Sequence, residues 1–165
     1  MPMRSTAWLE MRSLSETTLA TSSTVTWFVE VKNPLATSQT VNLDDVVAWN
    51  EDLLVKLNLQ NGNFESGFVN DPDASHQRPS GWTKYLSSGT YTAVPDTGLY
   101  RSSGTSWKIS GANWAIGIYQ QATGATSGNE VGARVSARSD FPSESLHHVV
   151  NINGLTVDPL WEGYE

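Results

Sequence analysis

Histidines and nearby acids could bind a metal or take part in catalysis, because imidazole serves both as a metal ligand and as a general base. His76 follows two carboxylates, Asp71 and Asp73. A metal cluster and a solvated acidic loop both fit this segment, and we favour the loop. His147 and His148 are adjacent, and on a strand they would point to opposite faces, which excludes joint binding of one metal ion. The sequence carries no nucleophile elbow, phosphate-binding loop, dinucleotide fingerprint or zinc motif. We therefore predict that the protein is not an enzyme.

Aromatic side chains are the second group that indicates chemistry, since the chain has seven Trp and five Tyr. Sugar rings pack on aromatic faces while amides bond the hydroxyl groups. A sugar-binding platform would draw on six residues: Trp114, Tyr119, Trp82, Tyr85, Asn113 and Gln120. Core packing is the alternative, and it is favoured for Trp27, Trp82 and Trp107. We expect Trp114 and Tyr119 to be more open, because Gly111 and Gly117 flank them.

Composition narrows the class of partner. The chain has 17 acidic and 10 basic residues, and a net charge of −7 argues against a nucleic-acid partner, because phosphates are bound by clustered Lys and Arg. No apolar stretch approaches the length of a membrane span. Residues 1–8 lack the apolar core of a secretion signal. We therefore expect the protein at a virion or another extracellular surface, reached by lysis or by assembly.

Strand patterns dominate the chain, and helical periodicity is almost absent. The clearest strand is 25–31, where Val25, Trp27, Val29 and Val31 share one face and Phe28 lies on the other. A long loop is predicted at 66–81, and a hairpin at 148–157 around Asn153-Gly154. The remaining strands are predicted at 7–12, 40–49, 53–59, 83–85, 91–93, 98–100, 107–110, 115–120 and 130–139. The pattern favours an all-β fold, a two-sheet antiparallel β-sandwich of the jelly-roll type.

Several short motifs resemble a known family when taken in order. An Asn-Gly-x-Phe-Glu stretch at 61–65 is followed by Gly81-Trp82 and by 106–111, Ser-Trp-Lys-Ile-Ser-Gly. This order resembles the opening half of the β-sandwich carbohydrate-binding modules of families 4 and 9, which are galactose-binding-like jelly rolls. In that family the Asn-Gly-x-Phe-Glu stretch is a strand, so the resemblance implies a strand at 61–65. The opening half is matched over 58–140. Residues 6–49 resemble the closing half, with Trp27–Val31 matching a Trp-bearing strand and Asp44-Asp45-Val46 matching the last strand.

The two halves stand in reverse order, which three arrangements explain. The chain is a circularly permuted single domain over 1–165, or it exchanges one half with a neighbouring subunit, or it is cut from a tandem array. Permutation ranks first and exchange second. In either of the first two, 141–165 adds a C-terminal hairpin and tail.

The resemblance also implies a structural calcium site. In the family, the Asp-Asp-Val and Phe-Glu motifs lie together and supply oxygen ligands, the kind that calcium prefers. Carried over to this chain, Glu65 and Asp44 would be carboxylate ligands, Asp45 a neighbour and the Lys108 carbonyl a further oxygen. The alternative is two solvated acids at strand ends.

Two functions follow as expectations. The first is a non-catalytic structural or surface-display subunit of an extracellular assembly, such as a phage decoration, fibre or tail protein, with itself or other structural proteins as partners. The aromatic tail at 160–164 would then be a docking segment. The alternative is a glycan-binding module of a secreted polysaccharide-degrading system, with a polysaccharide as partner.

Overall fold

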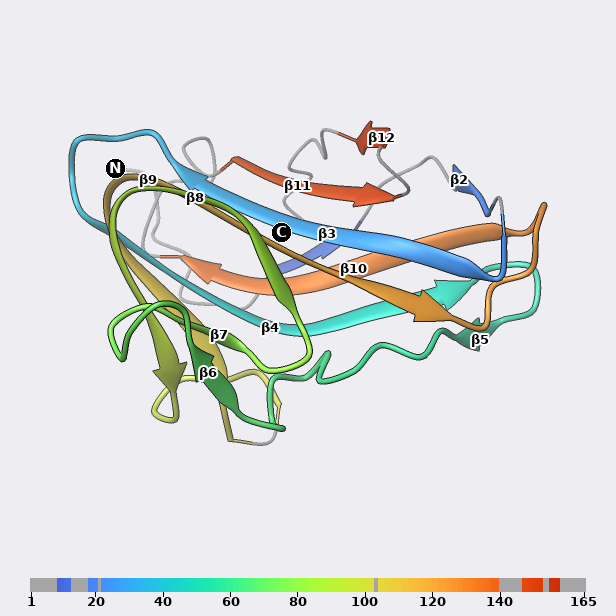
Figure 1. Ribbon diagram of the computed structural model, residues 1–165, viewed down its shortest axis with the longest axis horizontal. Helices are drawn as coiled ribbons and strands as arrows, with labels where there is room; N and C mark the ends of the chain where they lie inside the picture. Colours follow the sequence, from blue (N-terminus) through green and yellow to red (C-terminus); the bar gives the residue numbers. More distant parts are fainter. Residues whose placement is uncertain are drawn as a thin grey trace.

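The computed structural model describes residues 9–12, 18–20, 22–102, 104–139, 147–152 and 155–157. The described part is all-β, with antiparallel sheets packed against each other, as the sequence predicted (Figure 1). No helix in the described part of the chain is long and apolar enough to cross a membrane. The strands are β1 (Leu9–Arg12), β2 (Thr18–Leu19), β3 (Thr24–Asn33), β4 (Gln39–Asn50), β5 (Val55–Lys56), β6 (Phe68–Asn70), β7 (Gln77–Pro79), β8 (Thr83–Asp96), β9 (Ser106–Thr123), β10 (Glu130–Ser139), β11 (His147–Ile152) and β12 (Leu155–Val157).

The long strand β9 belongs to both layers of the sandwich. Its first part, residues 107–111, pairs with β4, and its second part, residues 114–123, pairs with β3. Strand β8 follows β9 along most of its length. One layer therefore runs β1-β10-β4-β9-β8, and the other runs β8-β9-β3-β11-β12. The β8–β9 hairpin is common to the two layers.

A bend near the middle of this hairpin lets it pass from one layer to the other. The pairing shifts register between Gly89 and Thr90, opposite Asn113, which has a φ of 51°. Gly89 has a φ of 80°, and a Cβ placed there would lie 1.7 Å from the carbonyl oxygen of Asn113. Only glycine fits this close backbone approach. The buried Asn33 side chain fixes the bend by donating to the carbonyl of Gly111 at 2.9 Å.

Strand β3 packs one of its two faces into the core between the layers. Val25, Trp27, Val29 and Val31 are at most 3% exposed, while Phe28 lies on the opposite, outer face. This is the alternation predicted from the sequence. The core has two parts, a large aromatic one and a smaller one rich in alanine. The two strands of the predicted C-terminal hairpin pair as β11 and β12, while its turn at 153–154 and the tail at 160–164 lie outside the described residues.

The two sequence blocks that resemble half-domains contribute strands that pair with each other within one chain. Strands β3 and β4, from the first block, pair with β9 and β10, from the second. Within the second block, Phe64 packs edge-on against both Trp82 and Trp107, with ring centroids 6.4 Å apart in each pair. The described strands of the two blocks thus form one sandwich. Its relation to the family order stays a hypothesis.

The Asn61–Glu65 stretch itself is a turn, so the expectation of a strand there was wrong. Asn61 and Phe64 have φ values of 49° and 59°. The Asn61 amide donates to the carbonyls of Gly67 and Ser80, and its oxygen accepts from the N–H of Ser66. Asn-Gly is a strong turn signal, and it outweighed the apolar context.

Other predicted boundaries also need correction. The strand predicted at 53–59 is reduced to β5, because the turn of residues 51–54 carries Leu53 and Leu54 into solvent. Residues 98–100 form a loop, and the loop predicted at 66–81 contains the small β6–β7 sheet. The separate strands predicted at 83–85 and 91–93 are one strand, β8, and those at 107–110 and 115–120 are β9. A bulge or bend that contains no Pro lets the strand continue on both sides of it. The sequence therefore carries no signal that separates one long strand from two short ones.

Candidate functional site

A buried acid on β4 holds the loop between β8 and β9. Asp44 is 0% exposed. Its Oδ2 accepts hydrogen bonds from the backbone N–H groups of Arg101 and Ser102, at 2.8 and 3.3 Å, and its Oδ1 accepts from the N–H of Asp45 at 2.8 Å. Burial raises the pKa of Asp44 to about 6, although these hydrogen bonds oppose the rise.

Two further acids bind the same loop. The Asp45 carboxylate accepts from the Ser102 hydroxyl at 2.6 Å and lies 3.3 Å from the Arg101 guanidinium. Glu65 accepts from the N–H of Thr105 at 2.9 Å. Asp44 and Glu65 therefore bind neighbouring parts of one loop. We call Asp44, Asp45 and Glu65 the acid clamp.

Hydrogen-bond donors occupy the carboxylate oxygens of the acid clamp in this arrangement. Calcium needs six to eight oxygen ligands, whereas N–H donors point at the oxygens of Asp44, and the cation of Arg101 pairs with Asp45. Lys108 lies within β9, between Asn42 of β4 and Val94 of β8. No group of three or more His, Asp or Glu side chains suited to a metal occurs among the residues described. The calcium site stays a prediction, to be checked by melting with and without chelator.

The acids of the long loop are paired separately. Asp71 lies 2.8 Å from the Arg78 Nε and 3.1 Å from the Lys84 Nζ. Asp73 pairs with His76 at 2.8 Å. Asp71 thus faces two cations, and His76 takes only Asp73 as a carboxylate partner among the described ion pairs. This arrangement favours the acidic-loop interpretation.

The six residues of the predicted sugar platform do not lie together. Trp82 and Trp114 are core residues, 1% and 2% exposed, so the expectation that Trp114 is open was wrong. Their indole N–H groups are bonded to the carbonyls of Asn61 and Gly111. Gln120 is buried and bonds both backbone groups of Gln60. Asn113 is exposed at the hairpin bend. Only the tyrosines remain as neighbours.

Tyr85 and Tyr119 lie on the outer face of the β3 layer with a third ring. The Phe28 centroid is 5.2 Å from that of Tyr85 and 5.5 Å from that of Tyr119, and the two tyrosine centroids are 6.1 Å apart. Tyr85 is 42% exposed. We call Phe28, Tyr85 and Tyr119 the outer aromatic cluster. Phe28 was expected on the strand face opposite Trp27 but was not predicted as a site residue, although a Phe on that face was the available signal.

Polar groups and a glycine fix the position of Tyr85. Its hydroxyl donates to Glu30 at 2.7 Å, and Lys32 lies 2.5 Å from the same carboxylate. Burial, together with the Glu30 contact, raises the pKa of Tyr85 above its ordinary value, which keeps the hydroxyl a donor. A Cβ added to Gly117 would lie 2.5 Å from the Tyr85 ring. The absence of a side chain at Gly117 therefore lets Tyr85 lie against β9.

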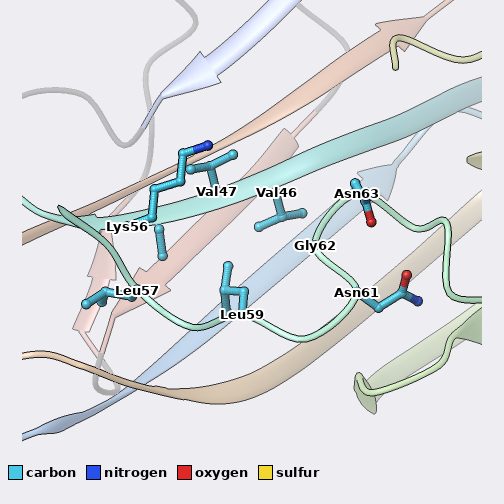
Figure 2. A pocket seen from close by; sticks show the side chains of 9 residues that line it. Val46, Val47, Lys56, Leu57, Leu59, Asn61, Gly62 and Asn63 are labelled. Atoms are coloured by element: carbon cyan, nitrogen blue, oxygen red, sulfur yellow. The ribbon is translucent and has the colours of Figure 1, made fainter. Parts of the chain in front are cut away.

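A groove runs between β4 and the segment of residues 57–63. Its volume is about 280 Å³. Figure 2 shows Val46 and Leu59 facing each other across it, with Lys56 at one end and Asn61 and Asn63 at the other. The segment is tied to β4 at both ends, since the N–H of Leu57 donates to Ala48 and the N–H of Val46 donates to Gly62, each at 2.8 Å.

Comparison of the chain with protein-family models, with curated proteins and with solved structures gave no match.

Proposed function

We propose that this protein is a non-catalytic β-sandwich module that binds a glycan on the outer aromatic cluster. The supporting observation is the contact of Phe28, Tyr85 and Tyr119 on an outer face, with Tyr85 42% exposed and held by Glu30. Aromatic rings provide flat apolar faces for the C–H groups of a pyranose, and Glu30 and Lys32 offer hydrogen bonds to its hydroxyl groups. The carboxylate and ammonium groups are paired, so an uncharged sugar suits the site best.

The test is binding to a panel of soluble polysaccharides by affinity electrophoresis. Tyr85→Ala should weaken binding roughly 10-fold, which is what removing one well-packed apolar ring is expected to cost. Tyr100→Ala is the matched control, because Tyr100 is 45% exposed but lies in the loop after β8. Equal losses in both variants, or no retardation by any polysaccharide, would reject the proposal.

A second variant probes the position of the ring without removing it. Gly117→Ala places a methyl group where the outer end of the Tyr85 ring now lies. Because the ring end is the part that must give way, we expect the fold to persist and the ligand affinity to fall. An unchanged melting temperature with weakened binding would tie affinity to the orientation of Tyr85.

A structural role in an extracellular or virion assembly is the second proposed function, and a separate feature favours it. Leu53 and Leu54, in the turn between β4 and β5, are 55% and 85% exposed, and Val55, the first residue of β5, is 46% exposed. Contiguous exposed apolar side chains are typical of surfaces that contact other proteins. An antibody to the protein should label purified particles of the source, such as phage decorations, fibres or tails. Absence from all particle fractions would reject this role.

A further inference from the structure

The turn between β4 and β5 presents apolar side chains in a defined shape. We call residues Leu53–Val55 the apolar tip. Leu54 is the most exposed of the three, at 85%, and has a φ of 53°. A left-handed conformation is costly for a branched apolar residue, and an exposed Leu gains nothing from burial. In Figure 1 the turn that carries the tip lies at the right-hand end of the sandwich.

The apolar tip is held firmly in place. The N–H of Leu53 donates to the Asn50 side chain at 3.0 Å. The turn is also bound to the start of β10, because the Glu51 N–H donates to the Glu130 carbonyl and the Glu130 N–H donates to the Asp52 carboxylate, each at 2.8 Å. A turn fixed by these bonds loses little conformational freedom on binding, which favours association.

The groove begins where the apolar tip ends. Lys56 follows the tip directly and lines the groove, together with the apolar side chains of Val46, Leu57 and Leu59. A volume of about 280 Å³ is adequate for an aliphatic side chain of the size of Leu. Tip and groove therefore lie next to each other at one edge of the molecule.

Opposite charges lie on the two sides of the apolar tip, and the positive one borders the groove. Glu51 and Asp52 precede the tip, and the exposed Lys56 lies at the groove. Because tip and groove are adjacent, a two-fold axis between two copies would let each tip enter the other groove, with the acids of one copy near the lysine of the other. From this complementarity we propose that two copies of this chain associate through reciprocal insertion of the apolar tip into the groove.

The contact is small, so the dimer is weak. Each copy contributes three tip residues and one groove, well below the area of about 800 Å² per partner that is usual in tight complexes. Micromolar or weaker association is expected. This inference deepens the assembly role proposed above, since it supplies the contact between neighbouring subunits.

Sedimentation equilibrium of the full chain, from micromolar to millimolar concentration, tests the proposal. The wild-type protein should show a reversible monomer–dimer equilibrium. Leu54→Asn should weaken it by about 100-fold or more, because two tips each lose a buried Leu. Asn tolerates a positive φ, so this variant should melt no lower than the wild type, which separates the contact from folding. Lys56→Glu should also weaken the dimer, and the loss should shrink at high salt.

Specific outcomes would overturn the proposal. A wild-type chain that stays monomeric at millimolar concentration rejects the reciprocal contact, and a dimer unchanged by Leu54→Asn places the interface elsewhere. A third outcome is that the wild-type monomer, but not Leu54→Asn, cosediments with phosphatidylcholine vesicles, which would assign the tip to a lipid surface. A monomeric chain that antibodies still locate in purified particles would overturn only this contact and leave the assembly role standing.

Discussion

Two acids hold irregular segments of this protein by different physical means. Asp44 is fully buried and bonds backbone N–H groups of the β8–β9 loop. Asp71 has a side chain 31% exposed and bonds the side chains of Arg78 and Lys84. The pKa of Asp44 is raised to about 6 by burial, whereas that of Asp71 is lowered, since the two cations outweigh its own desolvation.

The difference shows that the ionised form of a carboxyl group can destabilise or stabilise the fold, depending on which groups face it. Backbone N–H groups donate hydrogen bonds to the oxygens of Asp44, but these bonds do not offset the free-energy cost of burying its charge. The two cations that face the partly exposed Asp71 outweigh the free-energy cost of desolvating its charge, although solvent and salt weaken both ion pairs.

Removal of the buried acid should have the largest effect. Asp44→Ala leaves three backbone N–H groups without their acceptor, and we expect a loss of about 4 kcal/mol in the free energy of unfolding. Urea unfolding at about pH 4, where the carboxyl group of folded Asp44 is still protonated, measures this loss. Asp73→Ala is the matched control, because the Asp73 side chain is 58% exposed. A loss for Asp44→Ala no greater than that of the control would show that the loop does not depend on Asp44.

The pH dependence should differ in sign between the two acids. The folded pKa of Asp44, about 6, lies above its ordinary value of 3.8. Its contribution to stability is therefore fully present below pH 3.8 and is lost as the pH rises through 6, by about 3 kcal/mol in all. The pKa of Asp71 is lowered, so its contribution is present above pH 3.8 and is lost on acidification.

Urea unfolding between pH 4 and pH 8 gives the profiles. The difference in free energy between the wild type and Asp44→Asn should change across this window, while the difference between the wild type and Asp71→Asn should be nearly constant there. A flat profile for Asp44 would mean that its carboxylate is solvated.

The half-exposed acid should contribute less. Asp71→Asn removes two ion pairs but leaves neutral hydrogen bonding, and we expect a loss of about 1 kcal/mol. Chemical unfolding of Arg78→Gln and of the double variant completes a cycle that isolates the pair energy. A loss as large as that of Asp44→Ala would remove the contrast.

Salt should produce the smallest effect. Raising the NaCl concentration to about 1 M reduces the Debye length to about 3 Å and should weaken the Asp71 pairs by a few tenths of a kcal/mol. The Asp44 contacts are buried hydrogen bonds and should not respond. Comparison of each Asn variant with the wild type at low and high salt, after subtraction of the general salt effect, measures this difference. Equal responses would contradict it.

The sequence predicted the fold class and the faces of its regular strands well. The alternation in β3 placed the core residues correctly, because one buried face fixes a period of two. The hairpin bend was missed, since the close approach of Gly89 to Asn113 depends on two distant segments. Likewise, Asn61–Glu65 was matched to a strand although its own Asn-Gly signalled a turn.

The candidate sites were predicted less well, for a physical reason. Aromatic residues serve both the core and a surface, and the sequence does not say which of two adjacent strand positions a bend will expose. Trp114 was expected to be open and is buried, whereas Tyr85 bulges out between Lys84 and Leu86 to meet Phe28. The resemblance implied that Asp44 and Glu65 lie together, but the N–H donors that they bind in the β8–β9 loop carry no side-chain signal.

The hairpin of β8 and β9 has a consequence for how the protein unfolds. Because this one hairpin supplies strands to both layers, unfolding of either layer removes hydrogen-bonded strands from the other. Two sheets joined only by loops would be able to open one at a time. Here the shared hairpin joins them into one cooperative unit, and amides near the ends of β9 should exchange with deuterium through the same global opening.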